Sequence, residues 1–130
     1  MFRFSTSLLT LTVLTGCAEG MCGNRVLDTV ASPDGKYAAV IFERDCGATT
    51  RASTQVSILP SGEAPSGVGN IFIAETGAAS GGDPSGLEVE AAWLGPNRLR
   101  IRYSRNANIF RRVRERKSVQ VEYGANGSEN

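Results

Sequence analysis

The sequence predicts an all-β fold, either an antiparallel sandwich or a small open barrel of about six or seven short strands. Apolar and polar residues alternate over short runs, which is the pattern of half-buried strands. Turns rich in glycine and proline separate these runs, and no stretch of the mature chain has the periodicity of a long helix. We expect one β domain over residues 22–123, followed by a polar, disordered tail over residues 124–130.

Residues 1–16 have the layout of a bacterial export signal. Arg3 precedes a short apolar run that serines and threonines dilute, and this run is too short to span a bilayer. The following Leu14-Thr15-Gly16-Cys17 resembles a bacterial lipobox, which implies cleavage before Cys17 and lipid attachment to its thiol. Residues 17–21 are then a lipidated tether. The alternative is an ordinary secretory signal that leaves Cys17 free.

The residue after the lipobox cysteine bears on the membrane that holds the protein. Ala18 stands where Gram-negative lipoproteins that stay in the inner membrane usually have an aspartate. We therefore expect a lipid-anchored protein of the bacterial cell envelope, placed at the outer membrane and facing the periplasm. Several acyl chains on one cysteine anchor a domain far more firmly than a single chain does.

The first predicted hairpin surrounds the turn Ser32-Pro33-Asp34-Gly35. Each residue type in this turn favours it, and the flanking runs 25–31 and 36–44 are rich in β-branched and apolar residues. A three-residue loop at 33–35 makes the numbers of opposite residues sum to 68, so that Val26 faces Phe42. One pair in this register, Asp28 with Val40, combines a charge with an apolar side chain.

The same register predicts a disulfide bond. It places Cys22 directly opposite Cys46, within reach of a disulfide after small adjustment. Since Cys17 takes the lipid, the other two of the three cysteines form an even pair outside the cytoplasm. Such a bond stabilises the fold by about 3 kcal/mol in the chain-entropy model. The alternative is two unpaired buried thiols.

The middle of the chain predicts two more strands and two loops. In the first strand Val56 lies on an apolar face and Gln55 on a polar face, which indicates a strand buried on one side only. The predicted elements are a half-buried strand over 53–59, a loop over 60–69, a buried strand over 70–75 and a second loop over 76–86.

A second hairpin and a final strand complete the domain. Residues 87–93 and 98–103 alternate on both sides of the turn Gly95-Pro96-Asn97, and a three-residue loop places Trp93 opposite Leu99. The same register places acidic side chains opposite basic ones on the outer face. Residues 109–113 are ambiguous between a short strand and a helical turn, and residues 119–123 predict the last strand.

Three motifs together resemble a group of small bacterial lipoproteins of uncharacterised function. They are the lipobox, the run Ser32-Pro33-Asp34-Gly35-Lys36-Tyr37 and the run Arg44-x-Cys46-Gly47-Ala48-Thr49-Thr50. The resemblance covers mostly residues 22–60. It implies the envelope location and the disulfide, and it implies no activity.

The composition argues against most kinds of catalysis. The chain has no histidine, which excludes Ser-His-Asp and Cys-His catalysis and histidine-based zinc sites. We expect no metal and no cofactor. Glu88 and Glu90 lie two residues apart on one strand face, a superficial match to a glycosidase pair, but we expect Arg100 and Arg102 to pair with them. An Asp/Glu-based hydrolase remains the minor alternative to a protein that is not an enzyme.

Two groups of residues are candidates for binding. The first is a polar cluster beside the disulfide, formed by Arg44, Asp45, Thr49, Thr50 and Arg51, which suits an anionic or sugar group. The second is the segment 98–117, which holds nine basic side chains and one acidic one and includes Arg111, Arg112 and Arg114. The alternative for the first cluster is a solvated turn, and for the second a solvated face balanced by acidic residues elsewhere.

These observations predict an envelope-anchored lipoprotein that acts as a non-catalytic binding or interaction module. Its expected partners are the membrane, through the N-terminal lipid, and an envelope protein or an anionic surface polymer. Nucleic acid is not an expected partner outside the cytoplasm. The alternative is a small disulfide-stapled protein of the inhibitor or immunity type.

Overall fold

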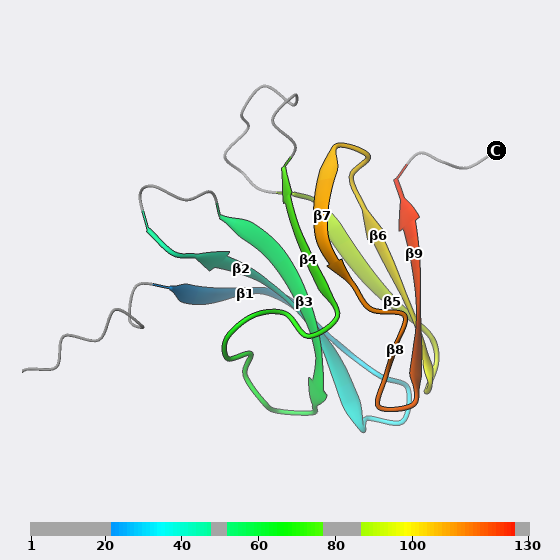
Figure 1. The fold of residues 1–130 in the computed structure, drawn as a ribbon. Helices are drawn as coiled ribbons and strands as arrows, with labels where there is room; N and C mark the ends of the chain where they lie inside the picture. The colour runs from blue at the N-terminus through cyan, green and yellow to red at the C-terminus, as the bar shows by residue number, and fades with distance from the viewer. Residues whose placement is uncertain (1–21, 48–51, 77–86, 127–130) are drawn as a thin grey trace, which may run out of the picture.

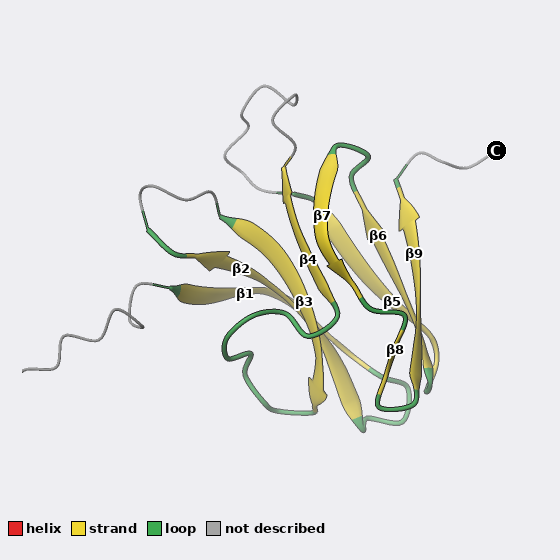
Figure 2. Cartoon of the chain, in the orientation of Figure 1, coloured by secondary structure: helices red, strands yellow, loops and turns green. Residues whose placement is uncertain are grey.

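The computed structural model describes residues 22–47, 52–76 and 87–126, and every regular element in these ranges is a β-strand (Figure 2). The prediction of an all-β fold is confirmed, with nine strands in the described ranges where the sequence indicated about six or seven. No helix in this part of the chain is long and apolar enough to cross a membrane. The strands are β1 (Gly23–Ala31), β2 (Tyr37–Asp45), β3 (Ser53–Pro60), β4 (Phe72–Thr76), β5 (Val89–Gly95), β6 (Arg98–Tyr103), β7 (Ala107–Arg112), β8 (Glu115–Arg116) and β9 (Val119–Ala125).

The strands form two sheets that face one another as a sandwich and do not close into a barrel (Figure 1). One sheet has the order β1-β2-β3-β4-β7 and the other the order β5-β6-β9-β8. All neighbours pair antiparallel except β6 and β9, which run parallel. The parallel pair arises because the chain leaves β6 for β7 in the other sheet and returns through β8. The edge strands are therefore β1 and β7 in one sheet and β5 and β8 in the other.

The turn of the first hairpin has four residues and not the predicted three. The amide of Ser32 donates to the carbonyl of Tyr37 (2.8 Å), so these two residues close the connection. Gly35 adopts a φ of 71°, which glycine tolerates because it has no Cβ. The hydroxyl of Ser32 donates to the carboxylate of Asp34 (2.7 Å), and this hydrogen bond lowers the pKa of that carboxyl.

A β-bulge in β1 compensates for the longer turn. Between the turn and the bulge each pair is displaced by one residue from the prediction, so that Val30 faces Ala39. Leu27 is the extra residue, and beyond it Val26 faces Phe42 as predicted. The predicted register therefore holds only at the end of the hairpin that carries the cysteines.

The second hairpin also contains a β-bulge. The pairs of β5 with β6 up to Trp93 are the predicted ones. Gly95 then pairs with Arg98, which leaves a two-residue connection, 96–97, in place of the predicted three residues. Leu94 is the extra residue at this bulge, and its side chain is exposed. This bulge lies at the end of β5 next to the turn, where it bends the strand.

The core lies between the two sheets. Phe72 occupies its centre and stacks on Tyr103 and Tyr123, with ring centroids 5.6 and 5.9 Å away. This packing joins β4 of one sheet to β6 and β9 of the other. The fully covered core consists of Ala39, Ile41, Val56, Ile58, Ile71, Phe72, Ala74, Leu87, Leu99, Ile101, Val119 and Val121.

A second apolar layer lies on the outer face of the five-stranded sheet. It consists of Ala38, Val40 and Phe42, all buried, with Leu59 packed against them. The prediction that the strand around residue 56 is half-buried is therefore wrong, because β3 is buried on both faces. The loop over residues 61–70, which we call the strap, accounts for this cover.

The strap is tied down by the polar side chains of β3. The amide of Gly69 donates to Oε1 of Gln55 (2.6 Å), and the amide of Asn70 donates to the hydroxyl of Ser57 (3.0 Å). The backbone approaches so closely that a Cβ on Gly69 would lie 2.6 Å from the carbonyl oxygen of Phe72. Only glycine fits at this position, since real Cβ atoms do not approach so near.

The C-terminal part is more regular than the sequence indicated. The ambiguous segment 109–113 is largely strand, because β7 ends at Arg112. The last strand continues through Gly124 and Ala125, so the prediction that a disordered tail begins at residue 124 is wrong for these two residues. Residues 127–130 lie outside the described part of the chain.

Candidate functional site

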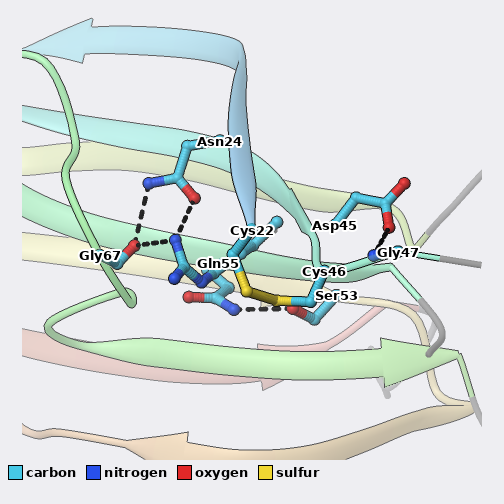
Figure 3. The surroundings of a disulfide bond; sticks show 9 residues. Cys22, Asn24, Asp45, Cys46, Gly47, Ser53, Gln55 and Gly67 are labelled. Carbon is cyan, nitrogen blue, oxygen red and sulfur yellow. Dashed lines mark hydrogen bonds between the residues drawn. A yellow bond between two sulfur atoms is a disulfide. The ribbon is translucent and has the colours of Figure 1, made fainter. Parts of the chain in front are cut away.

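The predicted disulfide is present. Cys22 and Cys46 are bonded, with their Cα atoms 3.8 Å apart (Figure 3). Cys22 directly precedes β1 and Cys46 directly follows β2, and two residues inward Asn24 and Arg44 pair with each other, on the same face as the disulfide. The bond therefore fixes the spacing of two strands at the point where Asn24 and Arg44 act.

Arg44 and Asn24 hold the strap. Nη1 of Arg44 donates to Oδ1 of Asn24 (2.8 Å) and to the carbonyl of Gly67 (3.1 Å). Nδ2 of Asn24 donates to the same carbonyl (2.9 Å), as Figure 3 shows. The sequence placed Arg44 in a binding cluster, and in the structure its guanidinium is engaged with the protein's own backbone.

Among the other members of the polar cluster, only Asp45 lies in the described part of the chain. The carboxylate of Asp45 accepts a hydrogen bond from the amide of Gly47 (3.0 Å), which is a local turn contact. Thr49, Thr50 and Arg51 lie outside the described residues, as does the predicted lipidation residue Cys17.

Arg111 is a second anchor of the strap. It extends from β7 at the far edge of the sheet, and its Nη1 donates to the carbonyl of Gly69 (3.0 Å). The strap is thus held by an arginine from each side, Arg44 near β1 and Arg111 on β7. Sequence reasoning missed this role, because a basic side chain that binds a carbonyl looks the same in sequence as one that faces solvent.

The basic segment divides into two parts with different surroundings. At its beginning Arg98 and Arg100 both pair with the carboxylate of Glu122, the second at 3.7 Å. These arginines stand on the outer face of β6, and Glu122 stands on the neighbouring β9. This part is a solvated, ion-paired face, and its charge is partly neutralised.

Further along, Arg112 contacts aromatic rings. Its guanidinium lies over the ring of Tyr123, 5.8 Å from the centroid, and its Nη1 is 3.4 Å from the hydroxyl of Tyr103. Within the described residues neither Arg112 nor Arg114 forms an ion pair with a carboxylate. Both residues are exposed, so their positive charge faces solvent.

The half-buried Tyr123 supports this arginine. Its hydroxyl lies within hydrogen-bond distance of the carbonyl oxygens of Ile71 (3.0 Å) and Val113. Burial raises the pKa of Tyr123 to about 12, against the lowering effects of the Val113 hydrogen bond and of the nearby arginines. The phenol is therefore neutral at physiological pH, and its role is to hold the backbone.

Phe110 adds an apolar group to the same edge. It is the extra residue of a bulge in β7, and 60 % of its surface is exposed. Phe110, Arg112 and Arg114 follow one another at every second position, and we call these three residues the arginine edge. Sequence reasoning included both arginines and missed Phe110, because the alternation of β7 gives no sign of a bulge.

The chemistry available at the arginine edge is anion binding. Guanidinium groups bind phosphate, sulfate and carboxylate groups through paired hydrogen bonds. The described residues contain no group of three or more His, Cys, Asp or Glu side chains that would suit a metal ion. No family model, no curated protein and no solved structure matches this chain.

Proposed function

We propose that this chain is a lipid-anchored protein of the bacterial envelope whose sandwich is a non-catalytic binding module for an anionic surface polymer. The observation that carries the proposal is the arginine edge. There Arg112 and Arg114 present charge that no described carboxylate neutralises, and the exposed Phe110 lies two residues before Arg112 in the chain. The lipid on Cys17 keeps this surface within the envelope, where such polymers are found.

The supports for this proposal come from different parts of the chain. The disulfide between Cys22 and Cys46 is a bond of oxidising compartments, which agrees with export. Arg112 is oriented in advance by the ring of Tyr123, so binding an anion costs less side-chain entropy than it does for a free arginine. The anchor itself is proposed from the lipobox Leu14-Thr15-Gly16-Cys17.

The anchor is tested by intact mass spectrometry of the native protein extracted from membranes. We expect a chain that begins at Cys17 and carries acyl chains, with two thiols that become alkylatable only after reduction. A soluble chain without acyl groups would contradict the anchored location and leave the sandwich itself unaffected.

The anion-binding surface is tested with matched double variants on immobilised dextran sulfate. We expect Arg112→Gln/Arg114→Gln to bind about tenfold more weakly than the natural protein, because two charge-assisted contacts are lost. The control is Arg98→Gln/Arg100→Gln, which removes the same number of positive charges from the ion-paired face. Equal weakening by both variants would show a response to net charge alone and would overturn the assignment to the arginine edge.

A further inference from the structure

An open groove runs between β1 and β5, the edge strands of the two sheets. The strands meet where Nε1 of Trp93 donates to the carbonyl of Val30 (2.8 Å), and they converge toward that end of the sandwich in Figure 1. Away from this contact they leave a groove of about 330 Å³. Its lining consists of Asp28, Val89, Glu90, Ala91, Ala92, Arg100 and Arg102.

The side of β5 that faces the core is incompletely covered along this groove. Val89 and Ala91 point toward the other sheet but are only partly buried. Their partners on β6 are Tyr103 and Ile101, and Ile101 has no exposed surface. Tyr103, opposite Val89, is itself only partly buried, so the incomplete cover reaches β6 at that end of the groove.

The backbone of β5 also has groups that point into the groove. The amide of Ser104 donates to the carbonyl of Glu88 (3.2 Å), which identifies the residues of β5 whose N–H and C=O groups face β6. In an antiparallel ladder these are alternate residues, so Glu90 and Ala92 also face β6. Val89 and Ala91 then direct their N–H and C=O groups away from β6, toward the groove.

The charges on the two strands that border the groove have the same sign. Asp28 lies on β1 and Glu90 on β5, so a side chain placed between these strands has a carboxylate on each side. The two arginines of the lining stand on β6, on the side of β5 away from an added strand; Arg102 lies opposite Glu90 and Arg100 lies 3.7 Å from Glu122. The groove therefore favours a basic side chain between its walls.

We propose that this groove binds an extended segment of a partner protein, which adds as a strand to β5 with apolar side chains toward the core and a basic side chain between Asp28 and Glu90. The backbone groups of Val89 and Ala91 pair with the segment, as in other cases of strand addition to a sheet edge. The short side chains of Ala91 and Ala92 let the second backbone come close. This surface is separate from the arginine edge and does not depend on the lipid anchor.

The test uses the folded sandwich labelled with ¹⁵N and the acetylated, amidated peptide Val-Lys-Val-Lys-Val. We expect chemical-shift changes at the amides of Val89 to Ala92 and slower hydrogen exchange at Val89 and Ala91 when the peptide is added. The same peptide with N-methyl groups on alternate residues keeps the side chains and loses backbone donors, so it should not bind. Equal binding of both peptides, or no shift along β5, would overturn the proposal.

Charge recognition is tested separately. We expect Glu90→Gln to weaken binding of the lysine peptide about threefold, which is the size of one exposed ion pair. Glu63→Gln in the strap removes the same charge far from the groove and should leave binding unchanged. Equal affinities for the two variants would overturn the basic partner. If the protein self-associates and the amides of Val89 and Ala91 are protected from exchange without peptide, the occupant of the groove is a second copy of this chain, and the proposal of a different partner is overturned.

Discussion

The two seams of the sandwich differ in how the sheets are joined. At one seam the chain itself crosses from β7 to β8, and the carbonyl of Ile71 accepts hydrogen bonds from the amide of Val113 (2.8 Å) and the hydroxyl of Tyr123. At the other seam the bond between Trp93 and Val30 ties two edge strands, and beyond it the groove opens. We call these the closed seam and the open seam.

This difference shows where the molecule can accept a partner. At the closed seam backbone polar groups are bonded within the protein, and an arginine covers the ring that supports them. At the open seam the backbone of β5 faces a groove and its apolar side chains are only partly covered. The closed seam therefore has its backbone polar groups bonded within the protein, and the proposed strand addition belongs to the open seam.

We expect the largest difference between the seams in the free energy of unfolding of two glycine-to-alanine variants, one beside each seam. Gly69 lies two residues before Ile71, whose carbonyl accepts a hydrogen bond from Tyr123. A Cβ added to Gly69 would also lie 2.9 Å from Cβ of Gln55. We expect Gly69→Ala to lower the free energy of unfolding by about 2 kcal/mol, because the strap must move away from β3. Urea-induced unfolding measures this change.

The matched control lies at the open seam. A Cβ on Gly95 would meet no atom within 4 Å, so Gly95→Ala should change the free energy of unfolding by less than about 0.5 kcal/mol. A loss in Gly69→Ala as small as that in Gly95→Ala would mean that the strap is not a tight part of the fold.

The sequence was sufficient to predict the hairpins but not their details. Both registers were inferred from loop length and cross-strand pairing, and both hairpins contain a bulged leucine, Leu27 or Leu94, that such inference does not detect. In the first hairpin a turn one residue longer and a bulge of one residue cancel, so Cys22 still faces Cys46. The misfit pair predicted at Asp28 was next to the bulge and was the one sign of it.

The burial of the outer face and the roles of the arginines could not be predicted from the sequence. The polar residues Gln55 and Ser57 look solvent-facing in an alternating pattern, yet they are buried because the strap places its amides on them. Arg44 and Arg111 were expected to bind a partner, and each binds a strap carbonyl instead. Such contacts join residues distant in sequence, and composition and periodicity do not report them.

A smaller effect at the closed seam is expected in alkaline solution. The pKa of Tyr123 is about 12 in the folded protein and about 10 in the unfolded chain. The stability that the neutral phenol provides is therefore complete below pH 10 and is lost as the pH rises toward 12. Urea midpoints measured between pH 9 and about 11.5 should fall.

Tyr123→Phe is the control for this pH dependence. It lacks the titrating hydroxyl, so its urea midpoint should fall less over the same alkaline range than that of the natural protein. An identical fall in both proteins would assign the alkaline loss to other groups and would remove Tyr123 from the account of the closed seam.

The most direct test of the difference between the seams is native-state hydrogen exchange at two neighbouring amides of β5. Ala92 is hydrogen-bonded into the sheet opposite Arg100, and the amide of Ala91 points into the groove. We predict that Ala92 exchanges at least about 100-fold more slowly than Ala91 in dilute protein. Equal protection of the two amides would show that the edge of β5 is already occupied, and it would contradict an open seam.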